Sequence, residues 1–187
     1  MLKPTVFHPS LYLTTETLLN YLLTLELNDK SVLELGCGSG AISLVLQSKK
    51  TITSYASDIN QSAIDGLKDN CATHGLNIKT FHSDLFDSIP DIDIDVIILN
   101  PPFFNNGISS ADEYAFNTGE DFQYFKKLSK QLIERKHHIV EIYMILTDKC
   151  DLENILSHFD DAHFGRETVY EGISLSETHY IYKITLL

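Results

Sequence analysis

The chain has 187 residues, with 14 lysines and arginines against 26 aspartates and glutamates, and therefore a formal charge of −12. This length suits one domain whose core needs no disulfides, and an apolar content of 43% excludes a disordered chain. The negative charge argues against a protein that grips long nucleic acids over its whole surface, because such binding requires clustered lysines and arginines. It leaves open an enzyme that acts on nucleic acid through a local basic patch.

Helices and strands are predicted to alternate along the chain. Apolar spacing, capping residues and glycine stops predict helices at residues 14–27, 41–48, 60–74, 116–136 and 152–159. Short apolar or β-branched runs predict strands at residues 31–35, 51–57, 78–82, 94–99, 139–146, 164–170 and 179–186. Strands that are apolar throughout favour a parallel sheet covered by helices on both faces.

The expected fold is therefore a doubly wound, Rossmann-like α/β domain with a mostly parallel seven-stranded sheet. A short link at Gly172 and Ser174 predicts that the terminal strand pairs antiparallel, at or near an edge. We expect one domain over residues 1–187, in which a helical segment at 1–30 precedes a core at 31–187.

Neither a membrane segment nor a metal site is expected. The chain contains three cysteines without a CxxC pair, Cys37, Cys71 and Cys150. They predict buried thiols in a reducing cytoplasm. No run has the length of a membrane helix or the apolar core of a secretory signal near the N-terminus. The alternating Asp91, Asp93 and Asp95 lack the glycine and glutamate of a calcium loop.

A glycine-rich stretch follows the first predicted strand. It reads Glu34-Leu35-Gly36-Cys37-Gly38-Ser39-Gly40. Glycines at alternate positions let the backbone turn tightly and approach a ligand beside a helix N-terminus. The stretch lacks the Gly-Lys-Ser/Thr of a P-loop, but with Ala41 it fits the degenerate dinucleotide pattern. It therefore predicts a nucleotide-type cofactor, without identifying which.

Acidic residues follow the next two strands. Asp58, after the second strand, can accept two hydrogen bonds from ribose hydroxyls. Asp84, after the third, can accept a hydrogen bond from an adenine amino group. Nicotinamide and adenosyl cofactors share these features, so the two acids do not discriminate between them.

The most informative motif is Asn100-Pro101-Pro102-Phe103, directly after the apolar strand at 94–99. The two prolines lock the backbone and leave carbonyls without competing amide donors. We expect the Asn100 side-chain oxygen and the Pro101 carbonyl to accept the two hydrogens of a planar –NH2 group. Phe103 offers a flat face for that group. A dinucleotide oxidoreductase would leave this motif unexplained.

These motifs, in this order, resemble the class I S-adenosylmethionine-dependent methyltransferases. More narrowly, they resemble the small methyltransferase domain whose NPP(F/Y) members methylate amino or amide nitrogens. The resemblance implies S-adenosylmethionine as the cofactor, with contacts at Glu34, Gly36, Gly38, Gly40, Asp58, Ile59, Asp84 and Leu85. It implies that the catalytic contacts are Asn100, Pro101 and Phe103. The glycine loop would pass the methionine part, and Ile59 and Leu85 would contact the adenine ring.

The substrate stays open between two classes. The acidity of the chain and the similarity of residues 115–125 to a HemK-like stretch favour a glutamine in a release-factor-like protein. Phe103, where HemK-like enzymes usually carry tyrosine, favours an RNA or DNA base, at adenine N6 or guanine N2. So does the basic cluster Lys126, Lys127, Lys130, Arg135 and Lys136, although we interpret it first as an exposed helical face.

A non-catalytic cofactor-binding subunit is the weakest interpretation, because such a subunit need not keep residues 100–103 intact. An activating partner subunit is a further option. Residues 105–110, rich in glycine, asparagine and serine, are a candidate lid over the substrate.

Overall fold

The computed structural model describes residues 9–103, 117–160 and 163–187. The helices are α1 (Pro9–Thr24), α2 (Ala41–Lys49), α3 (Gln61–His74), the short 3-10 helix η2 (Glu120–Phe122), α4 (Gln123–Glu134) and α5 (Leu152–Ser157). The strands are β1 (Ser31–Leu35), β2 (Thr53–Asp58), β3 (Ile78–His82), β4 (Ile94–Leu99), β5 (Ile139–Thr147), β6 (Phe164–Ser174) and β7 (Glu177–Leu186). The predicted lid at 105–110 lies outside the described residues.

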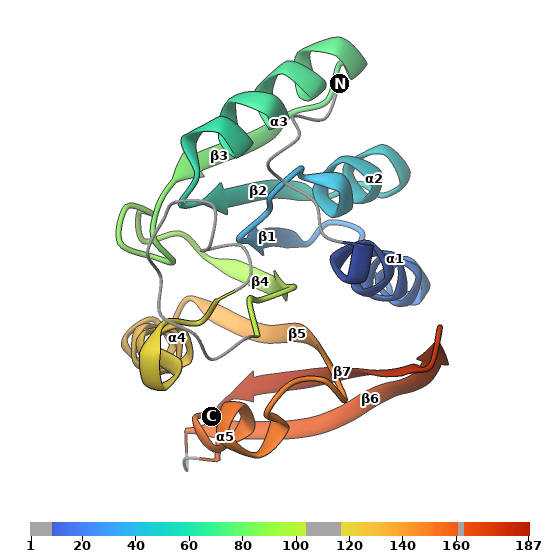
Figure 1. The fold of residues 1–187 in the computed structure, drawn as a ribbon. Helices are drawn as coiled ribbons and strands as arrows, with labels where there is room; N and C mark the ends of the chain where they lie inside the picture. The colour runs from blue at the N-terminus through green and yellow to red at the C-terminus, as the bar shows by residue number, and fades with distance from the viewer. Residues whose placement is uncertain (1–8, 104–116, 161–162) are drawn as a thin grey trace.

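The strands form one seven-stranded sheet with the order β3-β2-β1-β4-β5-β7-β6 (Figure 1). Strands β1 to β5 pair in parallel, while β7 pairs antiparallel with both β5 and β6. This confirms the predicted fold class. The chain reverses its winding between β3 and β4, so that β1 and β4 are neighbours at a topological switch point.

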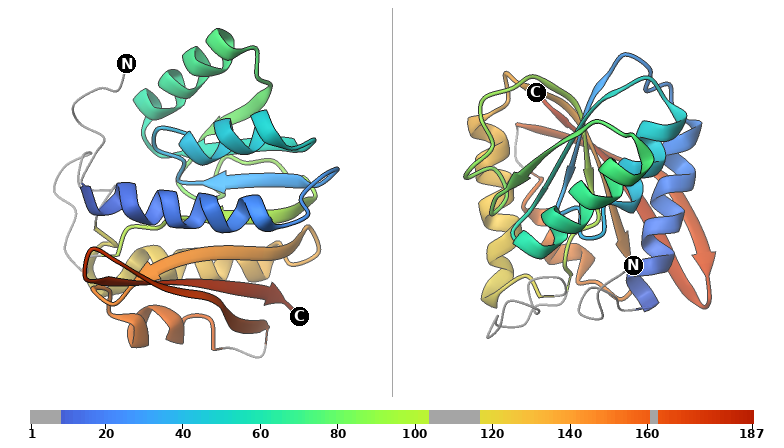
Figure 2. Two further views of the ribbon diagram at one scale, coloured as in Figure 1. Left: turned by 90° about the vertical axis from the view of Figure 1, so that its right-hand side faces the viewer. Right: turned by 90° about the horizontal axis from the view of Figure 1, so that it is seen from above.

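Helices cover both faces of the sheet, as the apolar strands predict. Viewed from above, α1, α2 and α3 lie on one side of the sheet and α4 on the other (Figure 2). On the first face Val32 packs in a cluster with Leu18 of α1 and Ile42 of α2. On the opposite face Leu33 joins a cluster with Phe125 of α4. Alternation along β1 therefore buries successive residues in two different core layers.

The link between the last two strands differs from the prediction. Gly172 and Ser174 lie within β6, and the turn is made by Leu175 and Ser176, whose φ angles are 47° and 66°. A two-residue hairpin with both residues at positive φ matches the twist of the flanking strands. The prediction of the turn position was wrong because glycine was taken as the marker, whereas the hairpin uses two non-glycine residues.

The boundaries of two helices also differ. Helix α1 begins at Pro9 and ends at Thr24, earlier than the predicted 14–27. Helix α4 begins at Gln123, well after the predicted start at 116, because Asp121 and Phe122 have φ angles of 57° and 56°. Left-handed backbone of this kind cannot continue into a right-handed helix.

The carboxyl ends of β1, β2, β3 and β4 meet at one edge of the sheet. Leu35, at the end of β1, is level with Ser57 of β2 and Leu99 of β4. Asp58 is level with His82 of β3. The segments that follow these strands carry the predicted site residues, so the topology brings them to the same edge.

Cys37, Cys71 and Cys150 are buried free thiols, as the sequence predicts. Each helix in the described part of the chain is too short or too polar to cross a membrane. Within the same ranges, no group of three or more His, Cys, Asp or Glu residues is placed to hold a metal ion.

Candidate functional site

The glycine loop after β1 adopts left-handed backbone at all three glycines. The φ angles of Gly36, Gly38 and Gly40 are 75°, 51° and 71°. The amides of Gly36 and Cys37 both donate to the carbonyl of Ser57 at 2.8 Å, which ties the loop to β2. A Cβ atom built on Gly36 or Gly38 would meet nothing within 4 Å, whereas one on Gly40 would lie 2.5 Å from Leu67 Cδ1. The loop is thus open at its first two glycines and packed against α3 at the third.

Asp58, the last residue of β2, holds this loop in place. Its Oδ2 accepts a hydrogen bond from the amide of Gly38, and its Oδ1 accepts one from the amide of Asn60, each at 2.7 Å. Burial raises the pKa of Asp58, and the two backbone hydrogen bonds oppose that rise. Because a carboxylate has about four acceptor positions, capacity remains for ligand hydroxyls. The ribose contact stays a prediction.

Glu34 lies beneath the loop. Its Oε2 accepts hydrogen bonds from the amide of Ser43 at 2.8 Å and from the Ser43 hydroxyl. Burial raises its pKa to about 7. Glu34 therefore links β1 to the first turn of α2. The sequence grouped it with the cofactor contacts, but these hydrogen bonds favour a supporting role.

The segments after β2 and β3 lie side by side. The amide of Ser83 donates to the carbonyl of Asp58 at 2.9 Å, and the ring of His82 is 2.8 Å from the carbonyl of Ile59. Asp84 is exposed, while Leu85 is buried with a φ of 50°. The structure thus brings Asp58, Ile59, Asp84 and Leu85 together.

Sequence analysis missed Tyr124, in the first turn of α4. Burial raises the pKa of its hydroxyl, and the negative charges of Asp58 and Asp84 raise it further. The tyrosine therefore lies close to both acids. No local pattern marks it, because an amphipathic helix carries partly buried aromatics wherever it meets a core.

Asn100 directly follows β4 and has an unusual side-chain environment. Its Nδ2 donates to Thr15 Oγ1 at 3.0 Å, so α1 fixes one side of the amide. Its Oδ1 is buried and has no hydrogen-bond partner among the described residues. An unpaired buried acceptor costs roughly 1–3 kcal/mol, so it marks a position that a ligand donor would satisfy.

The other two residues of the predicted catalytic set differ from Asn100 in their surroundings. Pro101 is buried next to it. Phe103 is only 5% exposed and belongs to the core cluster that contains Leu85 and Phe122. Most of the Phe103 ring therefore packs against the protein, and its contact with substrate stays a prediction.

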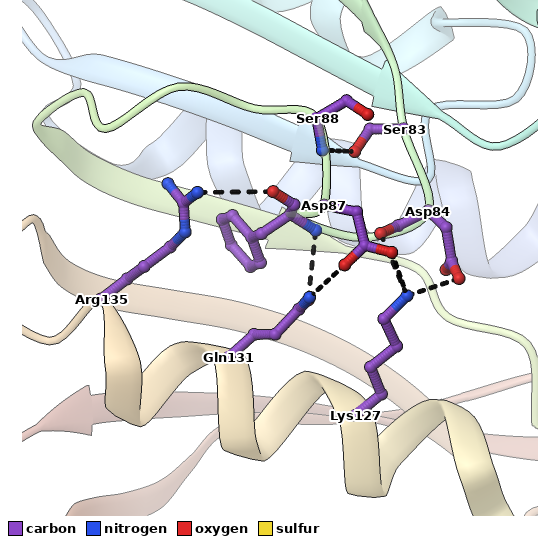
Figure 3. Close-up of polar contacts among 8 residues, drawn as sticks. Ser83, Asp84, Asp87, Ser88, Lys127, Gln131 and Arg135 are labelled. Carbon is purple, nitrogen blue, oxygen red and sulfur yellow. Dashed lines mark hydrogen bonds and ion pairs between the residues drawn. The ribbon is translucent and has the colours of Figure 1, made fainter.

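Only part of the basic cluster at α4 is an exposed face, because Lys126 and Lys130 are exposed whereas Lys127 and Arg135 are partly buried. Lys127 Nζ lies 2.5 Å from Asp84 Oδ2 and 2.6 Å from Asp87 Oδ2 (Figure 3). Arg135 donates to the carbonyl of Ile89 at 2.7 Å. Lys126 pairs with Asp121, and Lys130 lies 3.9 Å from Glu134. The prediction of an exposed face is wrong for Lys127 and Arg135, whose partners are more than 40 positions away in the sequence.

The fold and the site together define a class of protein. It is a doubly wound α/β domain in which a glycine loop, strand-end acids and an Asn-Pro-Pro-Phe segment gather at a topological switch point. Residues 3–116 match the sequence model of the methyltransferase small domain. The chain belongs to this family.

Several curated relatives are named as glutamine methyltransferases. A Methanocaldococcus jannaschii protein named as a protein N5-glutamine methyltransferase is 34% identical over 119 residues, which cover 61% of this chain and 60% of that protein. A Bacillus anthracis release factor glutamine methyltransferase is 36% identical over 148 residues, 71% of this chain and 52% of the relative. A Streptococcus pneumoniae release factor glutamine methyltransferase is 40% identical over 53% of this chain and 34% of its own length. The chain thus spans between about a third and three-fifths of these relatives.

Solved structures share the fold. The E. cuniculi Mtq2–Trm112 complex, described as responsible for methylation of the eRF1 translation termination factor, matches with a TM-score of 0.73 and 21% identity over 98% of this chain and 99% of the other. The T. thermophilus 16S rRNA N2 G1207 methyltransferase, solved with AdoMet and guanosine, matches with a TM-score of 0.63 and 16% identity over 97% of this chain and 44% of the other. Methyltransferases of this fold are therefore known with the cofactor bound.

Proposed function

We propose that the chain is an S-adenosylmethionine-dependent N-methyltransferase that modifies the side-chain amide of a protein glutamine. The observation that carries this proposal is the buried Oδ1 of Asn100, which has no hydrogen-bond partner in the described part of the chain, while Thr15 holds the amide from the other side. A neutral acceptor of this kind suits an N–H donor on a planar substrate. The family to which the chain belongs supplies the methyl-transfer chemistry.

The residues at the glycine loop fit the proposed cofactor. Open space above Gly36 and Gly38 suits a ligand that passes close to the backbone, and Asp58 keeps acceptor capacity for ribose hydroxyls. When bound, S-adenosylmethionine would supply a sulfonium methyl group. The substrate nitrogen would form a bond to this methyl carbon as the carbon–sulfur bond breaks. The bonding pair would stay on sulfur, and the nitrogen would release one proton to solvent.

Asn100 and Pro101 would prepare the nitrogen for this transfer. An amide nitrogen is a weak nucleophile because its lone pair is delocalised into the carbonyl. Two acceptors, Asn100 Oδ1 and the Pro101 carbonyl, would hold the two hydrogens and leave the lone pair directed at the methyl group. This arrangement needs no general base before transfer.

The protein substrate is favoured over a nucleobase by two observations. The first is that the relatives named above are glutamine methyltransferases. The second is that acidic side chains and backbone carbonyls of the same chain already contact Lys126, Lys127, Lys130 and Arg135. A release-factor-like protein is the substrate class that we propose.

The test is methyl transfer from labelled S-adenosylmethionine to fractions of a cell extract. The fractions are treated with protease or nuclease, and mass spectrometry locates the methyl group on the labelled product. The extract is used unheated, so that a partner subunit is supplied if the chain requires one, as Mtq2 forms a complex with Trm112. We expect protease-sensitive label on a glutamine; label removed by nuclease would instead assign a nucleobase substrate.

Asn100→Ala tests the role of the side chain. We expect turnover to fall by roughly 100-fold or more, as for the loss of a transition-state hydrogen bond, while the dissociation constant for S-adenosylhomocysteine changes by less than about twofold. Asn154→Ala is the matched control, because within the described residues the Asn154 side chain hydrogen-bonds only to Asp151, the N-cap of its own helix. Wild-type turnover in the Asn100→Ala variant would refute this mechanism.

A further inference from the structure

Lys127 and Gln131 of helix α4, together with its C-cap residue Arg135, are polar side chains four residues apart that face the loop between β3 and β4 (Figure 3). Residues four apart lie on one face of a helix. All three contact residues 83–91 of this loop. The row therefore holds the loop against α4.

Gln131 and Arg135 fix the backbone of the loop. The Gln131 amide accepts a hydrogen bond from the amide of Phe86 at 3.2 Å and donates to Asp87 Oδ1 at 2.6 Å. Arg135 donates to the carbonyls of Ile89 and Pro90 at 2.7 and 3.2 Å, and its guanidinium lies 5.2 Å from the Phe86 ring centre. These contacts give the second half of the loop one conformation.

Lys127 acts on the acids at the start of the loop. Its ammonium group bridges Asp84 Oδ2 and Asp87 Oδ2, and it holds the pKa of Asp87 below its usual range. Without this cation, two like charges three positions apart would repel. Lys127 engages Oδ2 of Asp84, and no hydrogen bond within the described residues engages Oδ1.

The position of Asp84 relative to Asp58, the predicted ribose contact, supports a ligand that both acids share. The amide of Ser83, next to Asp84, donates to the carbonyl of Asp58 at 2.9 Å. Asp58 ends β2, and Asp84 follows the neighbouring parallel strand β3. The negative charges of both acids raise the pKa of Tyr124 in α4. Both acids therefore border the same part of the site.

We propose that Lys127 is a positioning residue for the adenine end of the cofactor: by holding Asp84 Oδ2, it presents Oδ1 to the adenine amino group. This inference rests on the proposed function, since it takes the cofactor to be adenosyl-containing. The comparisons above name no residue of α4.

The experiment measures binding without a methyl acceptor. Isothermal titration gives the dissociation constants of S-adenosylhomocysteine and of its analogue whose purine lacks the 6-amino group. We expect Lys127→Met to weaken the binding of S-adenosylhomocysteine about five- to tenfold, since an exposed ion pair is worth up to about 1 kcal/mol and Lys127 pairs with two acids. Binding of the analogue should weaken by less than about twofold in the same variant, because the analogue makes no hydrogen bond to Asp84.

Two further variants serve as controls. Lys127→Arg keeps the charge and should retain most of the affinity. Lys130→Met removes a neighbouring lysine whose one ion pair among the described residues is with Glu134, and it should change neither constant. Comparing two ligands on the same protein separates adenine positioning from a general loss of folded protein.

Each other outcome counts against the proposal. Equal weakening of the binding of both ligands by Lys127→Met would assign Lys127 to loop stability alone. Unchanged binding would mean that Lys127 does not position Asp84 for the cofactor, and tighter binding would mean that Lys127 competes for Asp84. Equal wild-type affinity for the two ligands would remove the contact that Lys127 is proposed to support. Absence of wild-type binding would overturn the cofactor assignment in "Proposed function" itself, so the two failures are distinguishable.

Discussion

Burial and charge compete at the single residue Glu34. Its carboxyl group is inside the protein and takes two hydrogen bonds from Ser43, yet burial raises its pKa from 4.5 to about 7. The folded protein therefore keeps a proton that the unfolded chain releases in this pH range. Stability falls as the pH rises from 4.5 to about 7, and the whole penalty is present above that range.

Glu34→Gln should remove this pH dependence. Glutamine is uncharged, and its carbonyl can still accept from Ser43. We expect the free energy of unfolding of the wild type, relative to the variant, to fall by up to about 3 kcal/mol between about pH 5 and about pH 8. Urea denaturation of both proteins at the two pH values measures the difference. A difference that does not change with pH would contradict the assignment to Glu34.

At the scale of elements, the glycine loop shows that one motif can meet two separate requirements. Gly38 and Gly40 share left-handed backbone, with φ angles of 51° and 71°. Only Gly40 is pressed against α3, where an added Cβ would lie 2.5 Å from Leu67 Cδ1. The space above Gly38 is instead open, which suits a ligand.

Alanine substitutions should separate these requirements. Both carry a backbone cost of about 1–2 kcal/mol, and Gly40→Ala adds overpacking of about 1–3 kcal/mol. We therefore expect a clearly larger fall in melting temperature for Gly40→Ala. Gly38→Ala should weaken the binding of S-adenosylhomocysteine by about tenfold or more, because the methyl group of the new alanine enters the open space. Equal effects of the two variants on stability, or unchanged binding by Gly38→Ala, would contradict this division.

For the whole molecule, the charge of −12 can be compared with the surroundings of its basic residues. The one basic cluster in the sequence is largely matched by Asp84, Asp87, Asp121 and Glu134. This cluster therefore offers little unmatched positive charge for a phosphate backbone. This distribution agrees with a protein substrate.

We expect only weak binding to RNA. Fluorescence anisotropy with a single-stranded oligonucleotide should give a dissociation constant above about 100 µM at about 0.15 M salt, the weak end of non-specific binding. The double variant Asp121→Asn, Glu134→Gln releases Lys126 and Lys130 and should bind more tightly than the wild type. Micromolar, salt-dependent binding by the wild type would contradict this interpretation and revive the nucleobase alternative.

Much of the fold could be predicted because its signals are local. The strand at 31–35 and the helix stop at Gly75 depend on residues within one element, where periodicity and turn preference act. The motifs at the strand ends follow from the same patterns once the sheet is taken as parallel. Local signals failed where an unexpected residue took left-handed backbone, as at Phe122 and Leu175.

The sequence by itself determined the alternation of elements, the glycine loop, the strand-end acids and the Asn100–Phe103 turn, since each is encoded by neighbouring residues. Only the tertiary structure decided how these groups are held. The bond from Asn100 to Thr15 joins residues 85 positions apart, and the pair of Lys127 with Asp84 joins residues 43 positions apart. Such contacts leave no periodic trace in the sequence, because they depend on which faces of the helices meet the sheet when the core packs.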